Sequence, residues 1–117
     1  MDAERALQEL VAELDRCAEE LSLARARAQE LLLERRAGHT WADIVSREAR
    51  PLVVERISTV LASLAGAGHA WRREQALALQ GEQVSINRIA AMFGVTRQRI
   101  SALLKERDDT PAPSVEL

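Results

Sequence analysis

Residues 86–105 read INRIAAMFGVTRQRISALLK, and this stretch decides how the C-terminal part of the chain folds. Ser85 precedes apolar residues at helical spacing, so its hydroxyl can cap a short helix. Gly94 supplies the left-handed backbone that ends a helix, and Thr96 can cap a second helix directly afterwards. The stretch therefore predicts two short helices joined by a tight turn.

The apolar side chains of these two helices are spaced to meet. We expect the small Ala90 to lie where the helices cross and Val95 to fill the corner between them. Ile100 and Leu103 are three residues apart, so they share one face of the second helix, which we expect to face the core. These residues, with Gly94, are the predicted structural positions of the pair.

The stretch resembles the helix-turn-helix of bacterial repressors, of the C-terminal DNA-binding domains of resolvases and of sigma-factor region 4. Ala90 and Gly94 match the small fifth place and the glycine at the ninth place of that motif. The apolar fourth, eighth, tenth, fifteenth and eighteenth places are matched by Ile89, Phe93, Val95, Ile100 and Leu103. The resemblance covers only this stretch of a 117-residue chain, so it identifies a module and not one family.

The resemblance implies that the second helix, from about residue 96 to 107, lies in the major groove of double-stranded DNA. Arg97 can form two hydrogen bonds with guanine, and Gln98 can form two with adenine. Side chains expected at the base edges are Arg97, Gln98, Ser101 and Ala102. Side chains expected at phosphates are Thr96, Lys105, Asn87 and Arg88.

The charge distribution favours the same segment. The chain has a net charge of −2, but residues 84–107 contain four arginines and Lys105 against Glu106 alone. A basic block in an acidic chain is expected where only that block meets phosphate. A solvated helix face that happens to be basic is the alternative.

The N-terminal region predicts one long amphipathic helix, which ends near Gly38. Its apolar residues recur at spacings of three and four, typical of a coiled coil. The predicted dimerisation residues are Leu7, Leu10, Leu14, Cys17 and Leu21. We expect a homodimer, with parallel or antiparallel helices, and a buried, reduced Cys17 thiol. A helix packed entirely within its own chain is the alternative.

Residues 38–83 predict three short helices. Thr40 can cap the first, which extends to about Arg47, and the second extends from Leu52 to about Ala65. Gly66 and Gly68 are expected to separate it from a third helix that ends at Gly81. Residues 39–57 also resemble a degenerate second helix-turn-helix. The favoured interpretation is that they form a scaffold that supports the helix-turn-helix at 86–105.

The composition predicts an all-α fold, because alanine is abundant and only Trp41, Trp71 and Phe93 are aromatic. We expect a dimerisation helix at 1–37, a helical DNA-binding domain at 38–107 and a disordered acidic tail at 108–117. The long helix should be followed by a small helical bundle that ends in the helix-turn-helix.

The sequence favours a sequence-specific DNA-binding protein, a homodimeric bacterial transcriptional regulator of the cytoplasm and nucleoid. It contains no catalytic constellation, phosphate-binding loop or zinc pattern, so no enzyme, cofactor or metal site is expected. No apolar run approaches the ~20 residues that span a bilayer. Two alternatives stay open: an interaction module for a protein partner such as a sigma factor or polymerase, and an architectural or phage-type accessory DNA-binding protein.

Overall fold

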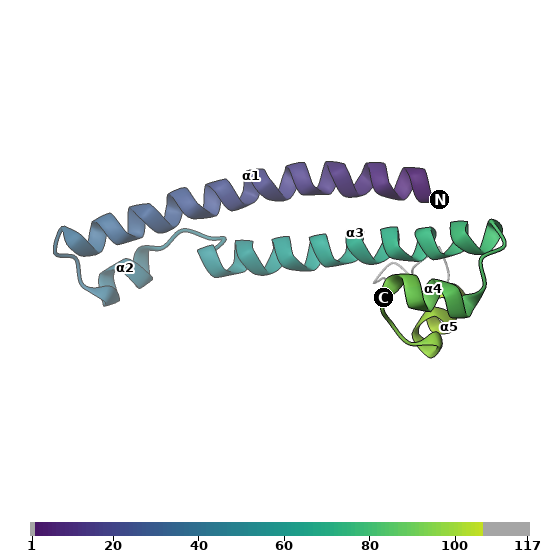
Figure 1. Cartoon of the computed structure of the whole chain (residues 1–117). Coiled ribbons are helices and arrows are strands. Elements are labelled where there is room, and N and C mark those ends of the chain that lie inside the picture. Colours follow the sequence, from purple (N-terminus) through teal and green to yellow (C-terminus); the bar gives the residue numbers. More distant parts are fainter. Residues whose placement is uncertain (1, 107–117) are drawn as a thin grey trace, which may run out of the picture. The chain divides into compact units, whose positions relative to one another are not determined.

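The computed structural model describes residues 2–106, and every element in this part of the chain is a helix (Figure 1). The helices are α1 (Ala3–Arg36), α2 (Trp41–Arg47), α3 (Val53–Gly81), α4 (Ile86–Phe93) and α5 (Arg97–Lys105). The all-α prediction with a long N-terminal helix is confirmed. The predicted tail at 108–117 lies outside the described residues.

Both ends of α1 follow the rules of helix capping. The carboxylate of Asp2 accepts a hydrogen bond from the backbone amide of Arg5 at 2.8 Å, which satisfies one of the free amides of the first turn. At the other end Gly38 adopts a φ of 104°, and its amide donates to the carbonyl oxygen of Arg35 at 3.1 Å. The predicted end of the first helix near Gly38 is confirmed.

The second helix also begins where the sequence predicts. Thr40 is the N-cap of α2, and its hydroxyl accepts from the amide of Asp43 at 3.1 Å. Ile44 is the buried residue of this helix. The predicted span to about Arg47 is therefore confirmed.

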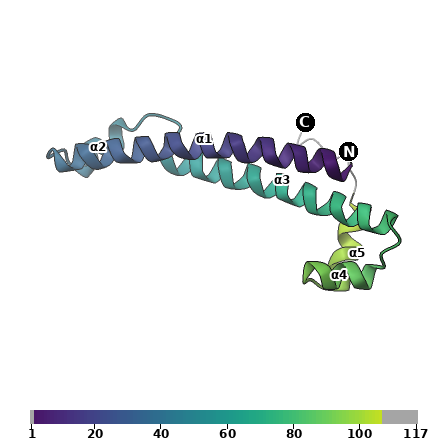
Figure 2. The same ribbon diagram turned by 45° about the horizontal axis from the view of Figure 1, so that its top comes forward.

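One long helix, α3, replaces two of the predicted short ones. The sequence interpretation separates two helices at Gly66 and Gly68, but the ribbon is unbroken from Val53 to Gly81 (Figures 1 and 2). Neither glycine has a positive φ. A helical glycine costs only about 0.5–1 kcal/mol relative to alanine, which packing against another helix readily offsets. The predicted break was wrong for this reason.

The described residues form two compact units. The hairpin unit is Glu9–Gly68, which contains most of α1, all of α2 and the first part of α3. The C-terminal unit contains residues 2–8 and 69–106, and so the rest of α3 with α4 and α5. The expected boundary after residue 37 falls inside the hairpin unit.

Within the hairpin unit, α1 and α3 lie side by side and run in opposite directions (Figures 1 and 2). Three contacts fix their register: the Cys17 thiol lies 4.0 Å from the carbonyl oxygen of Val60, Arg56 donates to Glu20 at 2.9 Å, and the Ser63 hydroxyl donates to Glu13. In this unit α1 therefore packs on its own chain, which is the alternative that the sequence left open.

The buried stripe of α1 overlaps only in part with the stripe predicted for dimerisation. Cys17 and Ala24 are each 4 % exposed, whereas Leu14 and Leu21 are 48 % and 45 % exposed. The α1 residues in the three contacts that fix the register carry small or polar side chains, namely Glu13, Cys17 and Glu20. Of the five predicted dimerisation residues, Cys17 is buried and Leu10 is half-buried, and Leu7 in the C-terminal unit is exposed. The expected burial of a free Cys17 thiol is confirmed.

A buried carboxylate lies beside that thiol. Glu13 is 7 % exposed and accepts hydrogen bonds from the hydroxyl of Ser63 and, at 3.4 Å, from the thiol of Cys17. It also pairs with Arg16 on its own helix. A buried charge is tolerated only when it is paired and hydrogen-bonded, and these three groups meet that condition.

Candidate nucleic-acid interface

Two short helices with defined caps form the candidate interface. The Ser85 hydroxyl accepts from the amide of Arg88 at 3.2 Å and begins α4, and the Thr96 hydroxyl accepts from the amide of Arg99 at 3.2 Å and begins α5. Gly94 lies between them with φ 70° and ψ 32°, the left-handed conformation that ends α4. Both predicted caps and the predicted turn residue are confirmed. The second helix ends at Lys105, slightly earlier than predicted.

The inner faces of α4 and α5 close a small core against the end of α3. The core consists of Ala76, Ile89, Ala90, Ile100 and Leu103, flanked by half-buried Leu79, Val84, Ile86, Phe93 and Leu104. Ile89 and Ile100 are almost fully buried, so both helices are held in a fixed orientation by large side chains. The predicted inward positions Ala90, Ile100 and Leu103 all lie in this core.

Val95 is placed differently from the prediction. It is 37 % exposed and borders a surface hollow instead of filling the corner between the helices. Phe93, two residues earlier, is half-buried against the core, and the guanidinium of Arg72 lies 4.1 Å from the centre of its ring.

The outward face of α5 presents the side chains predicted to read DNA. A shallow hollow of about 530 Å³ is lined by Arg97, Gln98, Ser101, Ala102 and Lys105. Ser101 is half-buried and the other four are exposed. Ala102 is exposed and has a small side chain, so it leaves room for a base edge to approach the helix.

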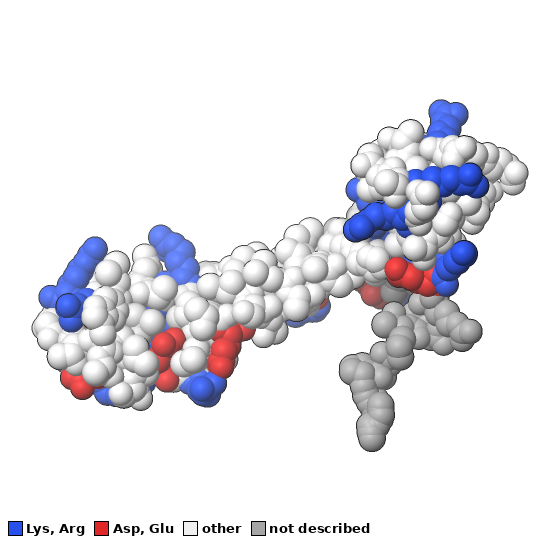
Figure 3. Space-filling view, turned by 90° about the horizontal axis from the view of Figure 1, so that it is seen from below, with Lys and Arg blue, Asp and Glu red and all other residues white. Residues whose placement is uncertain are grey.

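The residues predicted to contact phosphate are also accessible. Asn87 and Arg88 are exposed on α4, and Thr96 is exposed although its hydroxyl is engaged in the cap. Arg99 is exposed as well. Figure 3 shows Lys and Arg atoms gathered over the C-terminal unit, which gives this surface a positive field.

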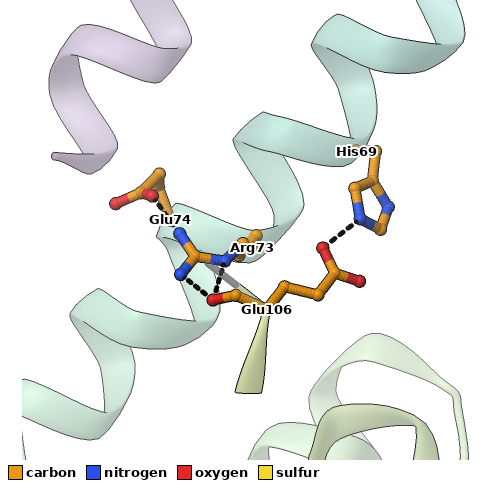
Figure 4. A network of polar contacts seen from close by, with 4 residues as sticks. All are labelled: His69, Arg73, Glu74 and Glu106. Atoms are coloured by element: carbon orange, nitrogen blue, oxygen red, sulfur yellow. Dashed lines mark hydrogen bonds and ion pairs between the residues drawn. The ribbon is translucent and has the colours of Figure 1, made fainter. Parts of the chain in front are cut away.

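A polar network attaches the end of α5 to α3 (Figure 4). Arg73 donates from Nε to the backbone carbonyl oxygen of Glu106 at 3.1 Å and pairs with the buried Glu74 at 2.7 Å. The Nε2 of His69 lies 2.7 Å from the carboxylate of Glu106. Because a carboxylate only accepts, the imidazole donates this bond. The network keeps the C-terminal end of α5 against α3.

Sequence reasoning missed this network and the second hollow of the C-terminal unit. The hollow has a volume of about 610 Å³ and brings Arg72 and His69 of α3 near Arg99 of α5 and its N-cap Thr96. The contacts of Arg73 and His69 with Glu106 join residues more than 30 positions apart, and no local pattern marks such pairs. Arg72 thereby adds a guanidinium beside the start of α5.

The arginines of the suspected second helix-turn-helix, residues 39–57, form contacts with other side chains of the same chain. Arg47 lies 3.3 Å from the Nδ1 of His39, and Arg56 pairs with Glu20. Arg50 pairs with Glu55. These internal contacts favour a scaffold role for residues 39–57.

Two further classes of site were searched in the described part of the chain. Residues 2–106 contain no group of three or more His, Cys, Asp or Glu side chains placed to hold a metal ion. Within the same range no helix combines the length and the apolar character needed to cross a membrane.

Comparison with known proteins gives no relative from which a function could be transferred. No family model matches the chain, and neither a curated protein nor a solved structure shows significant similarity to it. The function therefore has to be argued from the residues of this surface.

Proposed function

We propose that the chain is a sequence-specific DNA-binding protein that places α5 in the major groove. The observation that carries the proposal is the division of α5 into two faces. Ile100 and Leu103 anchor one face in the core, while Arg97, Gln98 and Lys105 project from the other into solvent. A short helix fixed in this way, with a basic and amide-bearing outer face, suits base recognition.

The roles of the side chains follow from their positions along α5. Arg97 and Gln98 lie in its first turn, where a recognition helix meets base edges. Ser101 and Ala102 lie one turn later, where a small side chain permits close approach, and Ala102 suits a thymine methyl group. Lys105, Asn87 and Arg88 lie farther out and supply charge for phosphates.

The proposal extends to a homodimeric bacterial transcriptional regulator in the nucleoid. One reader of this size offers few base contacts, so such modules commonly bind as pairs on half-sites about one helical turn, roughly 34 Å, apart. Two copies of α5 would supply the second half-site. The hydrophobic residues exposed on the hairpin unit favour association with a protein surface.

Selection of bound duplexes from a random pool tests the proposal. An enriched site, with affinity that falls steeply with salt, is the expected result. Binding without an enriched sequence would indicate an architectural or phage-type accessory protein. No binding at low salt would overturn the DNA-binding role and leave an interaction module for a partner such as a sigma factor or polymerase.

A scrambled version of the winning duplex is the matched control, because it keeps length and phosphate charge while removing the sequence. Sequence recognition predicts specific affinity at least about 10³-fold above that for the scrambled duplex. Equal affinities for the two would remove the sequence-specific part of the proposal.

A further inference from the structure

The large apolar side chains of the hairpin unit lie on its outside. Its buried apolar residues are few, namely Cys17, Ala24, Ile44 and Val60, and two of the four are small. Eleven larger ones in the same unit are exposed: Val11, Leu14, Leu21, Leu23, Leu32, Leu33, Trp41, Val45, Val54, Ile57 and Leu61. A helix pair with leucines in solvent and cysteine, alanine and glutamate in its seam has little core of its own.

Most of the exposed apolar residues of α1 and α3 share one side of the hairpin. They follow seam residues by one position: Val11, Leu14 and Leu21 follow Leu10, Glu13 and Glu20, while Ile57 and Leu61 follow Arg56 and Val60. One residue turns a right-handed helix by about 100°. Because α1 and α3 run in opposite directions, the same step turns both helices toward the same side. We name this side the apolar face, formed by Val11, Leu14, Ala18, Leu21, Val54, Ile57 and Leu61.

The opposite side of the hairpin is polar and partly covered. The residues that precede the seam positions by one include Glu9, Arg16, Glu19, Glu30 and Glu55. On this side Leu23 and Ala26 of α1 line a hollow with Ala49, Arg50 and Pro51 of the connection between α2 and α3. The hairpin unit is therefore amphipathic: several of its exposed charged side chains lie on the side away from the apolar face.

The α3 part of the apolar face carries no charge. From Ile57 to Gly68 the sequence contains no Lys, Arg, Asp or Glu, and Figure 3 shows mainly uncharged surface along α3 in this unit. On α1, Arg25 is the charged residue in line with Leu14, Ala18 and Leu21. Such a face suits a neutral, apolar partner layer and gives no attraction to a strongly basic or acidic peptide.

We propose that the apolar face binds the same face of a second copy, so that α1 and α3 of each chain form a four-helix bundle. A partner that is itself a layer of two helices can cover the exposed stripes of α1 and α3 at once. A second copy of the chain offers such a layer, and its apolar face is equally uncharged. An isologous twofold interface uses identical patches in this way. The inference rests on the homodimer of the proposed function but uses none of its DNA contacts.

The apolar face is long and covers both helices of the hairpin unit. The exposed apolar stripe of α1 runs from Val11 to Leu32, roughly six helical turns, and Val54, Ile57 and Leu61 of α3 lie beside it. A two-stranded coil through α1 alone would leave these α3 residues in water.

Sedimentation velocity on the full chain without DNA tests the interface. The wild type should be a dimer, and Leu61→Glu should be a monomer, because it places two carboxylates in the bundle core. Leu61 is 63 % exposed in the single chain, so a circular dichroism spectrum should show the helices intact. The matched control is Ala62→Glu, whose exposed neighbouring position points away from the apolar face and should leave the dimer unchanged.

A milder variant keeps the test decisive if Leu61→Glu fails to fold. Leu61→Ala should raise the dimer dissociation constant by at least about tenfold, since each dimer loses two buried leucines. A monomeric wild type at all concentrations would overturn the proposal. A dimer that Leu14→Glu dissociates while Leu61→Glu leaves it intact would also overturn it, in favour of a coil through α1 alone. Because no DNA is present, failure here is distinct from failure of DNA binding.

Discussion

Arg73 of α3 donates a hydrogen bond from Nε to the backbone carbonyl oxygen of Glu106, 3.1 Å away, and its guanidinium also pairs with the buried Glu74. Glu106 is the residue that caps the C-terminal end of α5. The carbonyl groups at a helix end have no partner within the helix, so a cation there is favourable. Arg73 therefore fixes the far end of the helix whose outer face we propose reads DNA.

We expect Arg73→Ala to lower the free energy of unfolding by about 1–3 kcal/mol, because it removes charge-assisted bonds and leaves the buried Glu74 without this partner. Urea denaturation followed by circular dichroism measures the change. Arg88→Ala is the matched control, since Arg88 is exposed on α4 and its side chain should affect DNA affinity but not stability. Equal denaturation midpoints for Arg73→Ala and the wild type would contradict the anchoring role.

The same substitution at two glycines should have opposite effects. Gly94 has a φ of 70°, where an alanine is strained even though nothing lies within 4 Å of the added Cβ. Gly66 lies inside α3 with equally open space around it. We expect Gly94→Ala to destabilise the protein by roughly 1 kcal/mol and Gly66→Ala to stabilise it by about 0.5–1 kcal/mol. Thermal melts of the two variants check the signs, and a stabilised Gly94→Ala protein would refute the turn geometry.

Arg97 and Lys105 should respond differently to a change of DNA sequence. Arg97→Ala is expected to cost about 1–3 kcal/mol on the selected site and little on scrambled DNA. Lys105→Ala should weaken binding to both duplexes and reduce the salt slope by about one phosphate. Fluorescence anisotropy across a salt series separates the two patterns. Equal losses on both duplexes for Arg97→Ala would exclude base reading by this side chain.

The candidate interface was largely predictable because short-range rules determine it. Ser85, Gly94 and Thr96 form hydrogen bonds or turns with residues three or four positions away, and such caps can be recognised in a sequence. The contacts of Arg73 with Glu106 and of Arg72 with Phe93 depend on where α3 ends relative to α4 and α5. Periodicity places residues on a face but does not say which distant residue meets that face.

The long helices were harder to predict, because more than one assignment satisfied the local pattern. A glycine is a weak helix breaker, so Gly66 could end α3 or lie within it, and packing decided the outcome. In α1 only part of the predicted heptad stripe is buried: Cys17 lies against α3, but Leu14 and Leu21 are exposed and Glu13 is buried. Glu13 and Glu20 are polar and do not stand out as buried positions in the sequence, because their partners Ser63 and Arg56 lie far along the chain.

The position of Cys17 predicts slow thiol chemistry. Its side chain is 4 % exposed and lies between Glu13 and the backbone of Val60, so a thiol reagent should label it much more slowly in the native protein than in urea. Leu23→Cys in a Cys17→Ser background is the control, because Leu23 is 53 % exposed. Ellman's reagent measures both rates.

The same burial predicts that oxidation gives no disulfide-linked dimer through Cys17. A parallel coil with Cys17 in its seam would instead bring the two thiols together. Non-reducing electrophoresis after mild oxidation separates these arrangements, and rapid formation of a crosslinked dimer by the wild type would contradict the placement of Cys17 against α3.

The start of α3 should contribute a pH-dependent part of the stability. The backbone amide of Leu52 donates to the carboxylate of Glu55 at 2.8 Å and lowers the pKa of Glu55, and the guanidinium of Arg50 lowers it further. Because the folded-state pKa lies below the unfolded value of about 4.3, this stabilisation is complete above that value. It is lost as the pH falls through the folded pKa. We expect the stability difference between the wild type and Glu55→Gln to be largest near neutrality and to vanish in acid.

Carboxyl-carbon NMR titration of Glu55 measures the shift directly. Arg50→Ala should raise the pKa only part of the way to its ordinary value, because the Leu52 amide still donates to the carboxylate. Complete recovery of the ordinary pKa in Arg50→Ala would assign the shift to the ion pair and not to the helix cap. In that case Glu55→Gln, whose side-chain oxygen can still accept from the Leu52 amide, should lose no more stability at neutral pH than Arg50→Ala.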